Sequence, residues 1–379
     1  MAPFIGACLI LVALPFIFEK SSIESKLYVV LLIVFVVIVN ATKIPEADLE
    51  NYYQWYDDLS KVSFIDAYKV NSSDPVFIYI TSLLTVFDSE RSFLIFWNFL
   101  NILLVVIVSA RLNKLIGFND NVLICTQLIL GIFYFSQPEH MTHTTRAFVS
   151  LSFMLLAISY LLKCYKGLFV ISSVASVGIH SSSLILLGSV FRYKRVLTLL
   201  VFSFAVGHFD IFNILKSLLS VFNWHAINNA LDYLIYRSSD LSQFIITSKQ
   251  LAIVFLELII VLFVYYTNAR YLKNDTVERL CQLFVFVCSL IFIFRNIPLF
   301  SVRVYMYHNY FFYLNVGSLF LIYHKIFSPR IGHKLVFSLL SICCIFVIYV
   351  NKFVLGSNWT YEFYSQDRIF QSLFGILGN

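Results

Sequence analysis

The stretch from Leu27 to Val39 has the sequence LYVVLLIVFVVIV, and it decides the fold. Its apolar residues do not alternate with polar ones, so the pattern argues against a strand of a membrane β-barrel. Comparable runs occur at Ser92 to Ala110, Leu251 to Tyr266 and Leu335 to Val350. Such runs approach the roughly 20 residues that cross about 30 Å of hydrocarbon as a helix. We therefore predict an all-α polytopic membrane protein with about 10–12 transmembrane or re-entrant helices.

The composition of the whole chain agrees with this fold class. Hydrophobic residues make up 60% of the 379 residues and charged residues only 13%, which is too little charge to cover a soluble protein. The net charge of +6 does not indicate nucleic-acid binding, because the basic residues lie in short segments between apolar runs. The 7 cysteines lie within or beside apolar runs, without zinc or disulfide spacing, and act there as small apolar residues.

The basic residues predict the topology, because short cytoplasmic loops of membrane proteins carry Lys and Arg. The result is one integral membrane domain over residues 1–379. It has external loops at 43–74 and 210–249 and a short outer helix at 75–88. The segment 167–190 has basic residues at both ends and is interrupted by Gly178 and by His180-Ser181-Ser182-Ser183. We predict a re-entrant hairpin with His180 at its turn; the alternative is one straight span with a buried, hydrogen-bonded His.

Three arginines break this charge pattern. Arg146, Arg295 and Arg303 fall at the outer ends of apolar segments. An arginine beside an apolar helix is costly and usually faces a cavity or a partner. Guanidinium groups bind phosphate bidentately and keep their charge, so the three residues predict an outward-facing diphosphate site. The alternative for each is a snorkelling or salt-bridged arginine.

The external loop 43–73 is acidic and rich in aromatic residues. Carboxylates can accept hydrogen bonds from sugar hydroxyls, while an aromatic face stacks on the C–H face of the sugar ring. The alternative is an interfacial aromatic belt with a solvated acidic face. The predicted sugar-binding residues are Tyr52, Tyr56, Asp57, Asp58 and, from the loop 210–249, Trp224.

Four short motifs resemble those of a known family, and they occur in the same order. They are Asp48-x3-Tyr52-x3-Tyr56; Asp74-Pro75-Val76-Phe77; Arg146 followed, after a basic turn, by Gly178-Ile179-His180-Ser181-Ser182-Ser183-Leu184; and Arg303 before the aromatic-rich span Val304 to Tyr313. The chain resembles the EpsG-like, O-antigen-polymerase-type (Wzy-type) membrane proteins of bacterial polysaccharide assembly. It departs from the family pattern at Val76, where Gly is usual, and at Ala147, where Gln is frequent.

The resemblance implies a GT-C-like architecture and a glycosyltransferase activity. The enzyme would join oligosaccharide repeat units, carried on undecaprenyl diphosphate, at the periplasmic face of the bacterial inner membrane. The residues implied as catalytic are Asp48, Arg146, His180 and Arg303, with Arg146, Arg295 and Arg303 on the diphosphate. The general base is one of Asp48, His180, Asp57 and Asp58, and Asp48 is favoured for its external position and its motif.

The resemblance also sets expectations for partners. The donor and the acceptor are both lipid-linked oligosaccharides in the bilayer, a separate chain-length regulator is expected, and nucleic acid is not. No cofactor is expected, because a sugar diphosphate is already an energised donor. No metal is expected where arginines carry the phosphate charge, and Glu139-His140-Met141-Thr142-His143 lacks the zinc-protease order of His and Glu.

Two other classes share the composition. A flippase or other transporter of lipid-linked oligosaccharides often has matching interrupted spans in two halves, and the second half of this chain has no counterpart to the break near His180. A membrane O-acyltransferase takes its acyl donor from the cytoplasm, whereas the unusual arginines fall on the outer side. The polymerase interpretation is therefore favoured.

Overall fold

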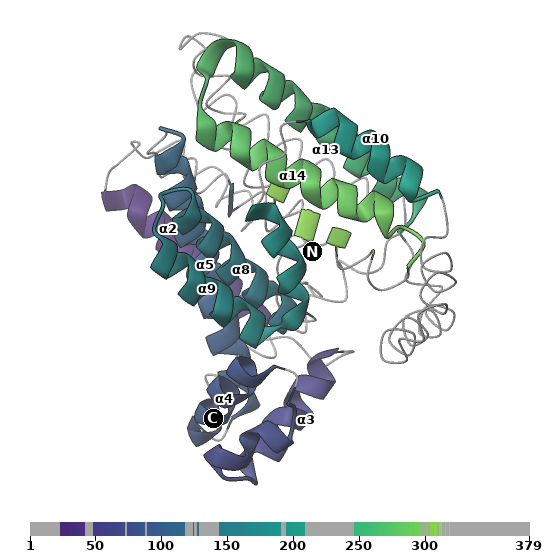
Figure 1. Cartoon of the computed structure of the whole chain (residues 1–379). Coiled ribbons are helices and arrows are strands. Elements are labelled where there is room, and N and C mark those ends of the chain that lie inside the picture. Colours follow the sequence, from purple (N-terminus) through teal and green to yellow (C-terminus); the bar gives the residue numbers. More distant parts are fainter. Residues whose placement is uncertain are drawn as a thin grey trace, which may run out of the picture. The chain divides into compact units, whose positions relative to one another are not determined.

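Every regular element in the described part of the chain is a helix (Figure 1). The computed structural model describes residues 23–41, 48–72, 74–87, 89–117, 144–190, 195–208 and 246–297, and the single positions 124, 127–128, 301, 304–305, 307–308, 311–312, 315 and 318. Contacts within the chain divide it into two compact units, residues 1–187 with 323–379 and residues 188–322. The predicted all-α polytopic class is confirmed.

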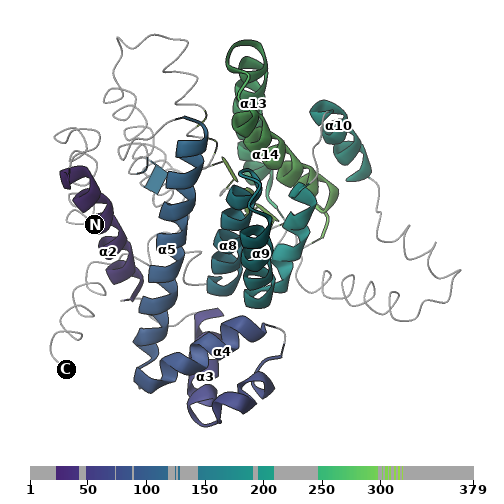
Figure 2. The ribbon, with the colours of Figure 1, turned by 60° about the vertical axis from the view of Figure 1, so that its left-hand side comes forward.

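The first unit contains the helices from α2 to α9. Their bounds are α2 Ile23–Ala41, α3 Asp48–Ser60, η1 Phe64–Lys69, α4 Pro75–Leu84, η2 Thr85–Phe87, α5 Glu90–Leu115, α8 Thr145–Leu161 and α9 Lys166–Ile179, where η1 and η2 are short 3₁₀ helices. A further 3₁₀ helix, η3 Ser181–Val190, follows α9 and begins in this unit. Figure 2 shows α8 and α9 side by side, and α2 beside α5.

Buried amides and hydroxyls join the long helices of this unit. The Asn40 side chain of α2 donates to the Asn98 side chain of α5 at 2.8 Å. On the same helix, Asn101 accepts from Ser152 of α8 at 2.6 Å. Apolar side chains gain little by leaving lipid for another helix, so such interhelical hydrogen bonds and close packing hold membrane helices together.

Helices α3 and α4 pack on the first turns of α5 through an aromatic core. Phe77 stacks on Trp97 with ring centroids 4.6 Å apart, and Tyr52 lies 5.8 Å from Phe77. Tyr56 is also buried, and its hydroxyl donates to the carbonyl of Leu84 at 3.0 Å. The segment predicted as an external loop at 43–74 therefore contains helix α3 and the 3₁₀ helix η1.

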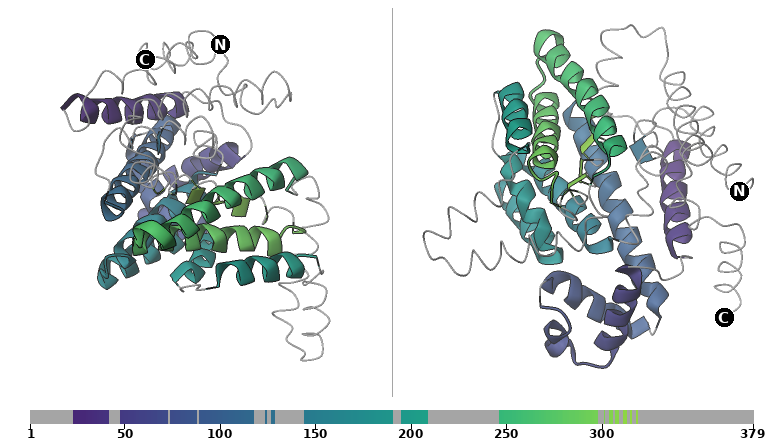
Figure 3. Two further views of the ribbon diagram at one scale, coloured as in Figure 1. Left: turned by 90° about the horizontal axis from the view of Figure 1, so that it is seen from above. Right: turned by 90° about the vertical axis from the view of Figure 1, so that its right-hand side faces the viewer.

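The second unit contains α10 Val196–Val206, α13 Ser248–Thr267, the π-helix η5 Asn268–Leu272 and α14 Asp275–Ile293. Thr247 begins α13 with a capping box, because its side chain accepts from Gln250 N–H while the Gln250 side chain accepts from Thr247 N–H. The Asn274 side chain caps α14 in a similar way. Figure 3 shows the resulting pair, α13 and α14, side by side.

Three of the described helices are long and apolar enough to cross a membrane: Glu90–Leu115, Gln250–Leu272 and Asp275–Ile293. Shorter apolar helices occur at Pro75–Phe87, Thr145–Leu161, Lys166–Ile179 and Val196–Val206. The chain is thus a multi-pass membrane protein. The predicted loop 210–249 falls almost entirely outside the described residues.

Candidate functional site

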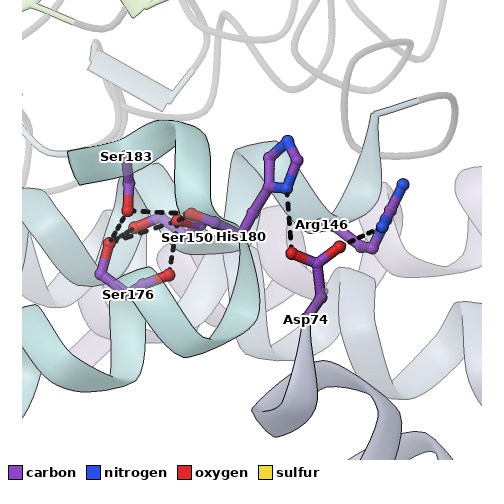
Figure 4. Close-up of polar contacts among 6 residues, drawn as sticks. All are labelled: Asp74, Arg146, Ser150, Ser176, His180 and Ser183. Carbon is purple, nitrogen blue, oxygen red and sulfur yellow. Dashed lines mark hydrogen bonds and ion pairs between the residues drawn. The ribbon is translucent and has the colours of Figure 1, made fainter. Parts of the chain in front are cut away.

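Three charged or titratable side chains from three segments of the first unit meet at one point (Figure 4). Asp74 precedes α4, Arg146 lies in the first turn of α8, and His180 separates α9 from η3. Asp74 forms an ion pair with Arg146 through one carboxylate oxygen. Its other oxygen lies 3.3 Å from Nδ1 of His180.

Asp74 occupies the N-cap position of α4 but does not cap the helix with its side chain. An N-cap Asp normally accepts from the second or third N–H of its own helix, and this use of the carboxylate is worth about 1 kcal/mol. The Asp74 side chain turns instead to Arg146 and His180, and it is only 2% exposed. It also accepts from the backbone N–H of Ser181. The carboxylate is therefore used to join three segments.

Arg146 lies where a helix disfavours a cation. The N-terminus of α8 carries the positive end of the helix dipole, which repels a guanidinium by a few tenths of a kcal/mol or more. The ion pair with Asp74 offsets this repulsion. The guanidinium carbon also lies 4.5 Å from the ring centroid of Trp55 and 5.5 Å from that of Tyr52, which adds cation–π attraction.

One donor of Arg146 remains unused. Its Nε is buried and has no hydrogen-bond partner among the described residues. A buried N–H without a partner costs about 1–3 kcal/mol, and a ligand oxygen that accepted this hydrogen would remove the cost. The side chain as a whole is 19% exposed. The accessible part of the guanidinium can therefore donate to an anionic ligand.

His180 is fixed by its main chain. Its backbone is extended, with φ −159° and ψ 118°, and this interrupts the helical path after Ile179. Its carbonyl oxygen accepts from Ser150 Oγ at 3.1 Å and from Ser183 Oγ at 3.0 Å. The single hydroxyl hydrogen of Ser176 is shared between the carbonyl of Ser150 at 2.7 Å and Ser183 Oγ at 2.9 Å. These serines let α8 and α9 pack closely and set the position of the imidazole (Figure 4).

The electrostatics of Asp74 follow from these contacts. Burial raises the pKa of its carboxyl, because a charge is costly away from water. The hydrogen bond from His180 and the positive charge of Arg146 outweigh that effect, so the pKa lies below its ordinary value of 3.8. Asp74 is therefore a carboxylate at neutral pH. Together, an anion, a guanidinium and an imidazole can bind an anionic group and move a proton beside it.

The structure brings together only some of the predicted site residues. Arg146 and His180 meet, whereas Arg295 belongs to the other unit. There it lies just beyond the C-terminus of α14, with its guanidinium carbon 5.9 Å from the Phe204 ring centroid. A cation is favourable at that end of a helix, so this position has a structural explanation. Arg303 and Trp224 lie outside the described residues.

The predicted residues of α3 have different environments. Asp48 is the first residue of the helix, and its side chain lies outside what the structure describes. Asp57 is exposed and lies 2.5 Å from the Lys61 ammonium, which is 3.9 Å from Asp58. Tyr52 and Tyr56 are buried. Their sugar-binding role stays a prediction, and the burial of the two tyrosines shows that they contribute to the core.

Two residues of the site, Asp74 and Trp55, had no role predicted from the sequence. Asp74 belongs to one of the four motifs, where it was expected only to start a helix. The signal that could have identified it is an acidic residue directly before a Pro-x-Phe helix start, in a chain with an arginine at the outer end of an apolar segment elsewhere. Trp55 is one of several aromatic residues on a segment predicted as a loop, and nothing in its spacing distinguishes it.

A second buried pair lies within the second unit. Oε2 of Glu257 is 2.5 Å from Nε2 of His308, and both side chains are almost completely buried. The distance suits an ion pair, but the relative orientation of the groups does not make a hydrogen bond. The Tyr305 and His308 rings stack at 5.3 Å. Within the described ranges, no group of three or more His, Cys, Asp and Glu residues could hold a metal ion.

A sequence model of the EpsG family matches residues 26–364, a range that contains Asp74, Arg146 and His180. No curated protein and no solved structure matches the chain.

Proposed function

Because this chain belongs to the EpsG family, we propose that it is the polymerase of a bacterial surface polysaccharide. The family makes it a membrane protein of polysaccharide biosynthesis. The finer proposal is that it joins oligosaccharide repeat units carried on undecaprenyl diphosphate. The product is O-antigen or a related polysaccharide, the reaction takes place at the periplasmic face of the inner membrane, and a separate protein sets the chain length.

The observation that carries this proposal is the cluster of Asp74, Arg146 and His180. A buried carboxylate holds a guanidinium at the start of a helix, where the helix dipole alone disfavours it. Such an arrangement is costly unless the cation is needed there. The Arg146 side chain is also 19% exposed, so the accessible part of its guanidinium can donate hydrogen bonds to an anion.

The proposed reaction needs two things from the protein. The growing chain is the donor, and the anomeric carbon of its reducing-end sugar is bonded to the diphosphate. A hydroxyl at the non-reducing end of a single lipid-linked repeat attacks that carbon. The carbon–oxygen bond to the diphosphate breaks, and the diphosphate leaves with the bonding electrons. A group must accept the hydroxyl proton, and another must stabilise the charge on the diphosphate.

We assign the second task to Arg146, with Arg295 and Arg303 as further proposed diphosphate ligands. The guanidinium suits the task because it stays charged and can donate two parallel hydrogen bonds to phosphate oxygens. Asp57 and Asp58 are exposed at the surface of α3, where they remain proposed partners of sugar hydroxyls.

Arg146→Lys tests the proposal. Lysine keeps the charge that Asp74 needs, so the protein should still insert and fold. A point charge cannot replace the planar guanidinium, and loss of one charge-assisted hydrogen bond costs about 1.5–3 kcal/mol, or about 10- to 100-fold in rate. We expect cells that carry this variant to lose most long polymer and to keep lipid A-core with a single repeat, as measured by lipopolysaccharide banding.

Arg111→Lys is the matched control. Arg111 also lies over an aromatic ring, 4.1 Å from the centroid of Tyr160, and it donates to Ser159 at 3.0 Å. It is not part of the cluster, so this variant should keep normal banding. Full-length polymer from Arg146→Ala would remove Arg146 from the site. Loss of every repeat, including the first, would instead indicate a flippase.

A further inference from the structure

We infer that His180 is the general base of the proposed polymerase and that Asp74 is the positioning residue that prepares it. This inference rests on the proposed function and assigns the proton transfer, for which four candidate bases were open. It also gives Asp74 a role beyond its ion pair with Arg146.

The hydrogen bond between Asp74 and His180 determines which imidazole nitrogen carries the hydrogen. A carboxylate can only accept hydrogen bonds, so the imidazole nitrogen that faces it must carry a hydrogen. That nitrogen is Nδ1, at 3.3 Å from the Asp74 oxygen. In the neutral ring the other nitrogen, Nε2, then has a free lone pair and can accept a proton. The low pKa of Asp74 supports this assignment, because it keeps the carboxylate deprotonated.

The Nε2 atom of His180 points away from Asp74. Figure 4 shows the His180 ring with Nδ1 toward Asp74 and the other nitrogen on the far side of the ring. The side chain is 12% exposed, so it is sheltered without being fully enclosed. Ser183 donates to the His180 carbonyl, and the Ser150 hydroxyl, whose hydrogen is shared with the Ser176 carbonyl, lies within hydrogen-bonding distance of it; these contacts fix the backbone from which the ring extends. The ring is therefore held from both its main chain and its Nδ1.

The charges that develop during the reaction can both be stabilised at this site. When the acceptor hydroxyl attacks the anomeric carbon, its proton moves to Nε2 and the imidazole becomes a cation. Asp74 stabilises that cation, since it already contacts Nδ1. At the same moment the diphosphate leaves with the bonding electrons and becomes more negative, beside Arg146. The charged side chains at this site are Asp74, which precedes α4, and Arg146 of α8. The imidazolium therefore has Asp74 as its partner of opposite sign, and the leaving diphosphate has Arg146.

The other described candidates for the base are less suitable. The Asp57 carboxylate already pairs with Lys61 at 2.5 Å, and Lys61 also lies within 4 Å of Asp58, at 3.9 Å. Both carboxylates are exposed to water, with 58% and 46% of the side chain accessible. A solvated carboxylate paired with a lysine is a weak base at neutral pH, whereas an imidazole is well matched to it.

The experiment measures polymer formation against pH. The substrate is the lipid extract of a strain that lacks this protein, added to purified enzyme in detergent. The variants are His180→Gln, Asp74→Asn, both together, and Asp74→Glu; Asp66→Asn is the control, because Asp66 is an exposed carboxylate that pairs with Lys69 at 2.6 Å. Elution from a sizing column checks that each variant is folded.

We expect the wild-type rate to fall on acidification, because a protonated histidine cannot act as a base. His180→Gln should lose about 10²–10⁴-fold in rate, and its profile should no longer show the acid limb. Asp74→Asn should lose about 10²-fold or more and shift the acid limb to lower pH, because the imidazolium has lost its anionic partner. Asp74→Glu should recover part of the activity, and the double variant should be no slower than His180→Gln alone.

Each unfavourable outcome has a distinct meaning. If wild-type enzyme consumes the lipid extract but His180→Gln keeps the rate and the acid limb, the inference is wrong and the proposed function stands. The inference is equally wrong if Asp74→Asn folds with an unchanged profile, or if it slows the His180→Gln enzyme further. Should Asp74→Asn not fold, the comparison of wild type with His180→Gln still decides. A folded wild-type enzyme that makes no polymer would overturn the proposed function and the inference with it.

Discussion

At the scale of single residues, the site depends on the charge of one buried carboxylate. Asp74 receives donors from Arg146, His180 and Ser181, and these lie on three different segments. Burial works against the charged form of Asp74, and the hydrogen bond from His180 and the charges around it overcome burial. Removal of one partner of a buried pair leaves the other uncompensated, which is the reason such pairs are sensitive to substitution.

The lowered pKa of Asp74 predicts a pH dependence of stability. A carboxyl whose folded pKa lies below its ordinary 3.8 stabilises the folded protein above that value, and the contribution is lost as pH falls through the lowered pKa. We expect wild type to exceed Asp74→Asn in thermal stability at neutral pH, and the margin to shrink as pH falls below about 4, where Asp74 itself becomes protonated. The measurement is the temperature at which detergent-solubilised protein loses its monodisperse elution peak.

Asp66→Asn is the control for this effect. Asp66 also has a lowered pKa, because Lys69 and Ser63 donate to it, but the pair is exposed and contributes little to stability. Its margin should be small at every pH. A margin for Asp74→Asn that does not shrink below about pH 4 would contradict the assigned charge state.

At the scale of elements, the position of His180 depends on how closely α9 approaches its neighbours. Ser150 and Ser176 join α8 to α9 by reciprocal hydrogen bonds. On another side, Gly178 faces Val76 of α4, and a Cβ at Gly178 would lie only 2.5 Å from Val76 Cγ2. The EpsG-like motif usually has Gly where this chain has Val76, so the space left by Gly178 admits a larger side chain at that position.

This contact makes a testable prediction. Gly178→Ala should destabilise the protein by about 1–3 kcal/mol through overpacking, although alanine is the better helix former by about 1 kcal/mol. Val76→Ala in the same chain should recover most of that loss, because it removes the methyl group in the way. A double-mutant cycle on unfolding in mixed micelles would measure the coupling.

The matched control is Gly167→Ala at the other end of α9. A Cβ at Gly167 meets nothing within 4 Å, so this variant should be neutral or slightly stabilising. If both glycine variants have the same effect, or if Val76→Ala does not rescue Gly178→Ala, the close approach of α4 and α9 is not what sets stability here.

At the scale of the whole molecule, the sequence predicts those properties that depend on apolar runs and on short motifs. The helical class, the membrane and the family follow from them. Arg146 is identified by its position against the charge pattern and His180 by the interruption of the segment 167–190, and the resemblance adds their catalytic roles. Asp74 could not be assigned, because its two partners are 72 and 106 residues away in the chain. The burial of Tyr56 could not be predicted from the sequence either, because a polar segment with several aromatic residues is equally typical of a solvated loop.

Topology is the remaining prediction at this scale, and the segment 167–190 tests it. Helix α9 has 14 residues and rises about 21 Å, which is less than the roughly 30 Å of hydrocarbon, so it cannot cross alone. Together with the 10 residues of η3 it would reach about 41 Å if straight, which is enough for a crossing. Length therefore permits both a span and a hairpin. The basic residues at both ends favour a hairpin, because both ends should then be cytoplasmic.

We expect Tyr165→Cys and Tyr193→Cys, each in a cysteine-free chain, to resist a membrane-impermeant maleimide applied to intact cells that have a permeabilised outer membrane. Both should react once the inner membrane is opened. A Cys at the exposed Ser72, in the segment predicted to be external, is the control and should react in intact cells. Reaction of Tyr193→Cys from outside would make the segment a straight span. The break at His180 would then lie within a single crossing.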